Sequence, residues 1–174
     1  FGACPAPTQD DGTLAPNTDE RLLFFGRGTL EAVRKLAWQP HLINFTGWFA
    51  AMIPFYLRRI NKENAFFSGT KMVITLMDDA FSGHIPGDLE RKMKTDGATA
   101  KDLRLYGDTT YLGLMKSAIT YSHGVIIGSP NANPELVAFA KENKRAVLDY
   151  IDDRDEFYAR INKFYDSIIG RIDN

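Results

Sequence analysis

The stretch "INFTGWFAAMIPFYLRR", residues 43–59, decides the expected fold because it predicts a buried strand that turns sharply into a helix. An amphipathic helical pattern runs over 48–60 and contains Pro54. An interior proline removes a backbone hydrogen bond, so a kink is expected near it. In an α/β protein, ligands usually sit where a strand ends and the next helix begins. Asn44, Thr46 and Gly47 at this junction offer no strong acid, base or metal ligand.

Short apolar runs on either side of this stretch predict the rest of the sheet. The expected strands are "HLINF" (41–45), "KMVITLM" (71–77), "HGVIIGS" (123–129) and "RAVLDY" (145–150). Near-continuous apolar runs of this length are typical of parallel strands covered on both faces. Helical patterns are expected at 18–36, 88–94, 99–105, 109–122, 133–143 and 153–172. This alternation predicts an α/β fold with a parallel sheet.

Two of the expected helices carry apolar stripes, which indicate the faces that they bury. The first helix follows a loop at 1–17, with Thr18 as its expected N-cap. Its core face is expected to comprise Leu22, Phe25, Leu30, Val33 and Leu36. The last helix is expected to bury Phe157, Ile161, Phe164, Ile168 and Ile172. We interpret this last stripe as core rather than as a binding surface.

Composition limits the class of protein. A chain of 174 residues suits one domain, 1–174, and its net charge of −1 favours neither nucleic acid nor a membrane surface as a partner. The single cysteine, Cys4, excludes an internal disulfide framework and favours a cytoplasmic setting. No run of apolar residues is long enough to predict a membrane span.

Motifs for cofactors and for covalent catalysis are missing from the sequence. It has no glycine-rich dinucleotide fingerprint, no phosphate-binding loop with a Lys-Ser or Lys-Thr pair, and no nucleophile elbow. His41 and His123 each begin an expected strand, which favours a structural role, whereas His84 follows a strand's carboxyl end and is a candidate ligand contact. We therefore predict neither a metal nor a cofactor.

Polar side chains at the strand ends leave two interpretations open. Asp78-Asp79 could bind a metal ion or hydroxyl groups, but no histidine or glutamate accompanies the pair, and capping of the following turn is the alternative to both. The segment 128–136, "GSPNANPEL", could present amides to an anion, or Ser129 and Asn133 could serve the turn and the helix cap. Hydroxyl and amide groups of this kind suit sugar recognition better than acid–base catalysis.

The order of the segments resembles the starch and glycogen synthase family over residues 8–172. The matching positions in 18–59 are Arg21, Phe25, Pro40, Trp48, Pro54, Tyr56 and Leu57. Thr75, Phe81 and Gly83 match a second family motif, and Ser129-Pro130 match a third. The resemblance is stronger to a short bacterial branch. An unrelated α/β domain is the alternative to this resemblance.

The resemblance implies a fold and a reaction. The implied fold is a Rossmann-like parallel sheet flanked by helices, the N-terminal half of a GT-B glycosyltransferase. The implied reaction transfers glucose from ADP- or UDP-glucose to an α-1,4-glucan. The residues expected to line the cleft are Asn44, Thr46, Gly47, Trp48, Met77, Asp78, Asp79, His84 and Ser129.

Departures from the family pattern favour a chain that does not catalyse transfer alone. Asn44 and Thr46 stand where the family has histidines, Gly47 replaces an aspartate, and Met77-Asp78 replaces a His-Asn pair. The family's phosphate-approaching loop would precede residue 1 and its second domain would follow residue 174. The alternative is a non-catalytic glucan-binding or regulatory module. Expected partners are α-glucan (glycogen), nucleotide sugar, and a second copy of the chain or a partner synthase.

Overall fold

A four-stranded parallel sheet forms the centre of the computed structural model, which describes residues 13–170. The strands are β1 (Leu42–Thr46), β2 (Lys71–Leu76), β3 (Gly124–Ile127) and β4 (Ala146–Leu148), and they lie side by side in chain order. The predicted α/β fold with a parallel sheet is confirmed. The predictions for Cys4, Ile172 and residues 1–12 lie outside the described residues.

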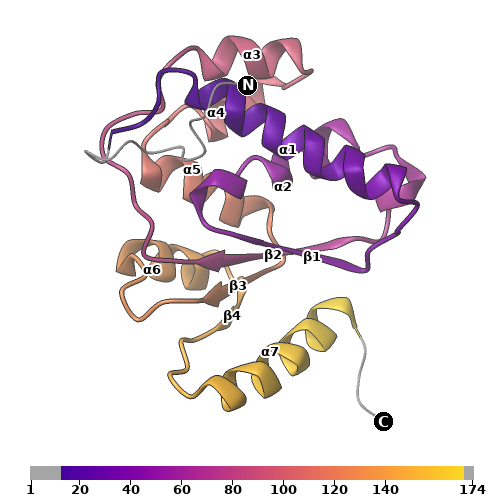
Figure 1. Ribbon diagram of the computed structural model, residues 1–174, viewed down its shortest axis with the longest axis vertical. Coiled ribbons are helices and arrows are strands. Elements are labelled where there is room, and N and C mark those ends of the chain that lie inside the picture. Colours follow the sequence, from indigo (N-terminus) through magenta and orange to yellow (C-terminus); the bar gives the residue numbers. More distant parts are fainter. Residues whose placement is uncertain (1–12, 171–174) are drawn as a thin grey trace.

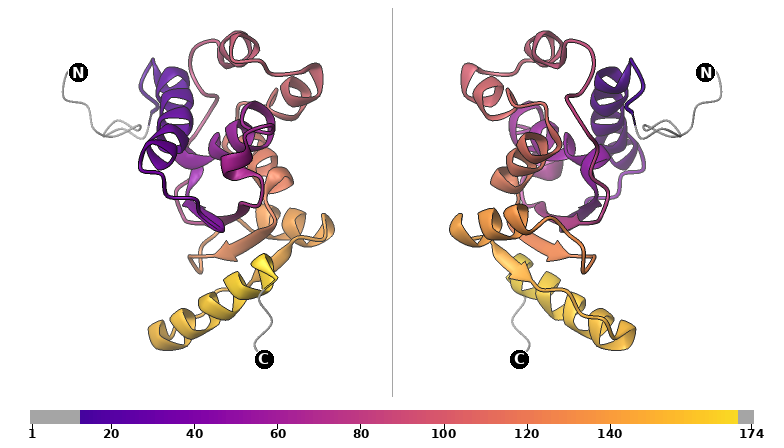
Figure 2. Two further views of the ribbon diagram at one scale, coloured as in Figure 1. Left: turned by 90° about the vertical axis from the view of Figure 1, so that its right-hand side faces the viewer. Right: turned by 90° about the vertical axis from the view of Figure 1, so that its left-hand side faces the viewer.

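Helices cover the two faces of this sheet unequally (Figures 1 and 2). Strands added successively in one direction place right-handed crossovers on the same face. That face carries α1 (Thr18–Lys35), α2 (Ile53–Phe55), α3 (Leu89–Thr95), α4 (Ala100–Leu105), α5 (Tyr111–Tyr121) and α6 (Pro134–Glu142). The other face carries α7 (Arg154–Ile169). The two short helices predicted in the polar segment 81–108 are present as α3 and α4.

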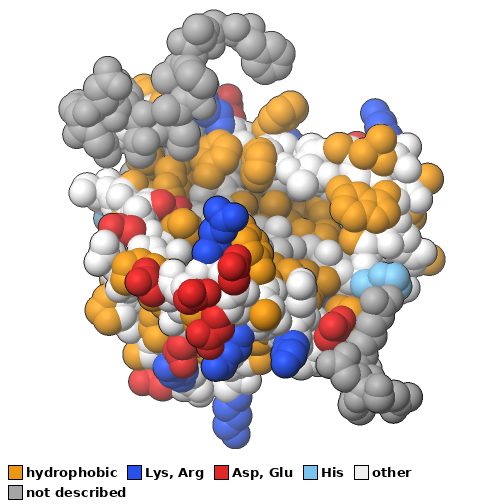
Figure 3. Space-filling model, turned by 60° about the horizontal axis from the view of Figure 1, so that its bottom comes forward, with side chains coloured by type: hydrophobic (Ala, Val, Ile, Leu, Met, Phe, Trp, Pro, Cys, Tyr) orange, Lys and Arg blue, Asp and Glu red, His pale blue; other side chains and the backbone are white. Residues whose placement is uncertain are grey.

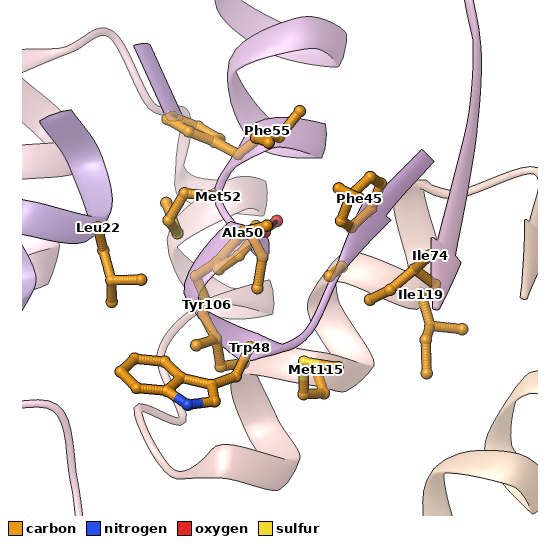
Figure 4. Close-up of a cluster of buried hydrophobic side chains, with 14 of the residues drawn as sticks. Leu22, Phe45, Trp48, Ala50, Met52, Phe55, Ile74, Tyr106, Met115 and Ile119 are labelled. Atoms are coloured by element: carbon orange, nitrogen blue, oxygen red, sulfur yellow. Dashed lines mark hydrogen bonds between the residues drawn. The ribbon is translucent and has the colours of Figure 1, made fainter. Parts of the chain in front are cut away.

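The main core lies between the sheet and the helices of the first face (Figure 4). Phe45 of β1 and Ile74 of β2 point into it from the sheet. Leu22, Phe55 and Met115 meet them from α1, α2 and α5, each 0% exposed. This packing fixes the direction of β1 and β2, and therefore the position of their carboxyl ends.

The second face has a smaller core under α7. Val73, Ile126 and Leu148 of the sheet pack against partly buried side chains of that helix, which include Phe157, Ile161, Phe164 and Ile168. Gly124 permits the close approach, because a Cβ there would lie 2.8 Å from Cζ of Phe164. No residue of α7 is fully buried. Figure 3 shows charged side chains of both signs beside hydrophobic ones on this side. The predicted stripe of α7 is confirmed as a packing face, but it is only half buried.

The face that α1 buries differs from the prediction. Phe25 is 40% exposed and Leu36 is 74% exposed, whereas Leu23 is buried. The reason is Gly26, where a Cβ would lie only 2.9 Å from Cδ2 of Tyr56. The helix therefore turns its glycine toward α2 and the turn after it. Thr18 is the first helical residue and not the N-cap, which is Asn17.

Residues 48–60 form three short turns instead of one kinked helix. A 3₁₀ turn over Trp48–Ala50 is followed by α2 and by a π-helical turn over Tyr56–Ile60. Pro54 lies in the first turn of α2, where a proline costs no helical hydrogen bond. The predicted continuous helix over 48–60 is therefore wrong, and Pro54 lies in the first turn of α2 rather than in a helix interior. A further 3₁₀ turn, Ala65–Phe67, precedes β2.

Candidate functional site

The turn at the carboxyl end of β1 depends on a glycine. Gly47 has φ 73° and ψ 174°, a conformation that is essentially restricted to glycine. Its amide donates a hydrogen bond to the carbonyl of Thr75 (3.1 Å), which continues the pairing with β2. A Cβ at this position would lie 2.3 Å from Oδ2 of Asp79. The absence of a side chain lets a carboxylate approach the backbone.

Asp79 uses this space to join three elements. Its Oδ2 accepts a hydrogen bond from the amide of Trp48 (2.9 Å), and its Oδ1 accepts one from the hydroxyl of Tyr111 (3.2 Å). Burial, followed by the charge of Asp79, raises the pKa of Tyr111 well above its usual value, which keeps the hydroxyl protonated as a donor. Asp79 therefore stabilises the turn after β1 rather than the turn that follows its own strand, β2.

Trp48 contributes its backbone to the strand end, and its side chain lies in the core. The indole is 5% exposed and packs against Phe81 (ring centroids 4.7 Å apart) and Phe49 (5.5 Å). Aromatic pairs at these separations stabilise a core beyond the area that they bury. The side chain expected to line a cleft is part of the packing at this strand end.

Asn44 and Thr46 point to the opposite face from Phe45, because side chains alternate along a strand. Both are exposed. The hydroxyl of Thr75 donates a hydrogen bond to Oδ1 of Asn44 (3.0 Å), which joins the polar groups of β1 and β2. The α7 side of the sheet thus carries polar groups near the carboxyl ends of these two strands.

The ends of β2 and β3 also lie together. A Cβ on Gly128 would lie 2.6 Å from Sδ of Met77, so these two residues are in close contact. Ser129 follows directly, and its hydroxyl accepts a hydrogen bond from the amide of Asn131 (3.2 Å). Asp78 is exposed. The structural interpretation of Ser129 is therefore supported, and Asp78 faces solvent at this strand end.

His84 contacts the segment before α5 rather than the strand ends. It forms an isolated bridge with Thr110, the N-cap of α5, and its Nδ1 lies 3.3 Å from Oγ1 of Thr109. The ring is exposed. Asn133 caps α6, as predicted, by accepting a hydrogen bond from the amide of Glu135 (2.9 Å).

The structure thus brings most of the predicted residues to one end of the sheet, with different roles. Asn44, Thr46 and Asp78 present polar groups to solvent, whereas Gly47, Asp79 and Ser129 shape turns. Within residues 13–170, no group of three or more His, Cys, Asp or Glu side chains could hold a metal ion. Nor is any helix in this range long and apolar enough to cross a membrane. The exposed groups can donate and accept hydrogen bonds from a ligand rich in hydroxyl groups.

Sequence reasoning missed Tyr111 and Phe81 as parts of this strand end. Tyr111 holds Asp79, and its ring lies 5.8 Å from that of Phe81. The sequence indicates Phe81 only as a match to a family motif. Neither role could be predicted from a local pattern, because the segments 78–81 and 110–111 meet only in the folded structure.

Comparisons with known proteins agree with this architecture. The family model for the starch synthase catalytic domain matches residues 6–149. A glycogen synthase of Elusimicrobium minutum is 31% identical over 69% of this chain and 25% of its own length. A glycogen synthase of Chlorobium limicola is 27% identical over 94% of this chain and 36% of its own length. No solved structure gives a significant match.

The chain spans about a quarter to a third of the length of these relatives. The family match covers most of the chain and includes β1, β2, β3 and β4 with the turns between them. The Rossmann-like arrangement of parallel strands and helices is the one expected for half of a GT-B glycosyltransferase. This chain is therefore a member of the starch synthase catalytic domain family.

Proposed function

We propose that this chain is the sugar-binding part of a glycogen synthase-like glycosyltransferase and does not transfer glucose by itself. The whole reaction would move glucose from ADP- or UDP-glucose to the end of an α-1,4-glucan. The proposed binding residues are Asn44, Thr46 and Asp78, with Met77 and His84 beside them. The relatives named glycogen synthase support the substrate class.

The observation that carries the proposal is the role of Asp79. A general acid or base must reach a proton of the substrate, and its pKa should lie near the working pH. Asp79 holds the amide of Trp48 and the hydroxyl of Tyr111. Asn44 and Thr46 do not exchange protons near neutral pH. The strand ends can therefore hold a sugar more readily than they can catalyse its transfer.

A non-catalytic accessory module is the alternative, and the same observation favours it. Such a module would bind glucan, or act on a synthase, without a donor nucleotide. Neither function predicts transfer by the chain alone, and they differ in whether the chain also binds a nucleotide sugar.

One experiment tests the claim that both functions share, glucan binding without transfer. The full chain is incubated with glycogen and labelled ADP-glucose or UDP-glucose, the polymer is sedimented, and both the label and the protein are measured in the pellet. We expect protein in the pellet without label. Asp78→Ala should reduce the sedimented fraction, whereas Asp155→Ala, an exposed aspartate of α7, should not. Both substitutions remove one exposed carboxylate.

Label above the control without protein would overturn the claim that the chain is inactive alone. Absence of both signals would contradict sugar binding altogether. Equal losses in the two variants would show that glycogen binds elsewhere on the surface. Sedimentation that is retained by Asp155→Ala and lost by Asp78→Ala supports the strand ends as the site.

A further inference from the structure

A second site lies at the other end of the sheet, where the strands begin. A pocket of about 560 Å³ opens there between the π-helical turn Tyr56–Ile60, the start of β2 and the segments before β3 and β4. Pockets of this size hold small molecules. Its lining includes five cationic residues and no carboxylate: Arg58, Arg59, Lys62, Lys71 and Arg145.

Two of these cations are neutralised by neighbouring carboxylates. Arg59 pairs with the buried carboxylate of Asp102 at 2.8 Å. Lys62 lies 3.9 Å from Glu63 in an exposed pair, which is worth little. No ion pair to a carboxylate of residues 13–170 is formed by the other three cations, Arg58, Lys71 and Arg145.

A structural role accounts for part of this cluster. Arg145 donates from Nη2 to the carbonyl of Thr120 (2.8 Å), and Arg58 donates from Nε to that of Tyr121 (3.3 Å). These carbonyls end α5, and cations stabilise the carboxyl end of a helix. The same contacts also fix the positions of both guanidinium groups. They leave Nε of Arg145 buried without an acceptor in the described chain, and they do not involve Lys71.

His123 adds a stronger argument, because its hydrogen bonds leave two donors facing each other. The amide of Met72 donates to Nδ1 of His123 (3.0 Å), since an amide N–H can only donate. In the neutral ring, the hydrogen-bond network therefore assigns the proton to Nε2. The nearest partner of Nε2 is Nη2 of Arg58 at 3.1 Å, which is also only a donor. An acceptor between them, from solvent or from a ligand, would satisfy both donors.

The neutral state of the ring is set by its surroundings. Burial, together with the charges of Arg58, Lys71 and Arg145, lowers the pKa of His123 to about 4. All three cations therefore act on the same imidazole. Burial and the charge of Arg145 also lower the pKa of Arg58.

We propose that Arg58, Lys71, Arg145 and His123 bind the phosphoryl group of a small phosphorylated compound in this pocket. A phosphate oxygen supplies the acceptor that Nε2 of His123 and Nη2 of Arg58 share. Guanidinium groups match the geometry of phosphate oxygens, and charge-assisted hydrogen bonds of this kind are strong. The apolar side chains of Leu57, Phe67 and Met72 line the same pocket and can receive the rest of the molecule. The site is independent of the proposed sugar-binding end.

The test is calorimetric titration of pyrophosphate into the full chain at constant ionic strength in chloride. We expect saturable binding with a Kd below about 1 mM, as two or three charge-assisted contacts imply. Lys71→Glu should weaken binding more than about tenfold. The side chain of Lys71 makes no hydrogen bond within residues 13–170, so this variant should fold. Lys101→Glu, on the exposed surface of α4, is the matched control and should bind as the parent does.

A second readout uses histidine labelled with ¹⁵N. Pyrophosphate should shift the resonances of the His123 ring and leave those of His41 and His84 unchanged. No saturable heat, equal losses in the two lysine variants, or no shift at His123 would each overturn the proposal. Competition by glucose 6-phosphate and by ADP then identifies the source of the phosphoryl group. Stronger competition by the first indicates a sugar phosphate, and by the second a nucleotide.

Discussion

The two ends of the sheet hold their charged groups in different ways. At the carboxyl ends, the carboxylate of Asp79 receives two hydrogen bonds and stabilises the turn after β1. At the amino ends, Arg58, Lys71 and Arg145 surround the neutral ring of His123 without a carboxylate partner in the described residues. A charged group that is satisfied inside the fold is stabilising, whereas a group of unpaired like charges favours binding of a counter-ion. The partners of the charged groups, rather than their number, therefore indicate which end of the sheet binds a counter-ion.

The largest expected effect comes from Asp102, the carboxylate that neutralises Arg59 at the amino end. Burial raises the pKa of Asp102, but hydrogen bonds from Thr99, Tyr121 and Arg59 outweigh it and lower the pKa to about 2. Asp102→Asn should lower the free energy of unfolding by about 3–4 kcal/mol, because it breaks a buried ion pair. Urea unfolding at pH 7 measures this. A loss below 1 kcal/mol would show that the pair does not hold α4 to the domain.

Gly47→Ala tests the carboxyl end. The new Cβ would meet Oδ2 of Asp79 at 2.3 Å, and the backbone conformation disfavours any side chain. We expect a loss of about 2–3 kcal/mol in the free energy of unfolding. Gly83→Ala is the control, since Gly83 also has a positive φ (78°) but has open space around its Cα. Equal losses in the two variants would indicate backbone strain alone and would remove the argument for Asp79.

The pH dependence of stability tests His123. Its pKa is about 4 in the folded chain and about 6.5 when unfolded. Unfolding therefore takes up a proton between these values, so the stabilisation is complete above pH 6.5 and is lost as the pH falls toward 4. We expect a loss of about 1–2 kcal/mol after allowance for solvent screening of this half-exposed ring.

Urea unfolding at pH 7.5 and pH 4.5 gives the size of this effect. His123→Asn should remove most of the loss, whereas His41→Asn, at an exposed position, should not. Bound pyrophosphate should raise the pKa of His123, because its charge opposes that of the three cations. A pH dependence unchanged by His123→Asn would contradict the assignment.

The smallest effect is expected for the stability of Lys71→Glu. This substitution replaces repulsion from Arg58 and Arg145 by attraction, so the free energy of unfolding should rise by about 0.2–0.5 kcal/mol in low salt. The gain should disappear at high salt because exposed charges are then screened. A clear loss of stability in thermal unfolding would show that Lys71 has a structural role and would weaken its use as a probe of the pocket.

Part of the candidate site could be predicted from residues that are neighbours in sequence. The predicted strand ends at Phe45, Met77 and Ser129 follow from apolar runs that are broken by polar residues, glycine or proline. Their convergence follows from the parallel sheet, which brings carboxyl ends to one edge. The burial of Trp48 could not be predicted, because it depends on Phe81 from another segment.

The α/β class, the four strands, the helix cap at Asn133 with Pro134 at the first helical position, and the family could all be predicted from the sequence. These follow from local periodicity and from the order of motifs. Three features depend on contacts between distant segments: the buried face of α1, the hydrogen bond from Trp48 to Asp79, and the pocket where Arg58, Lys71, Arg145 and His123 meet. Hydrogen bonds and charges act between residues that are close in space, whatever their distance in the sequence. The four residues of the pocket come from four separate segments, so no local pattern predicts that they meet.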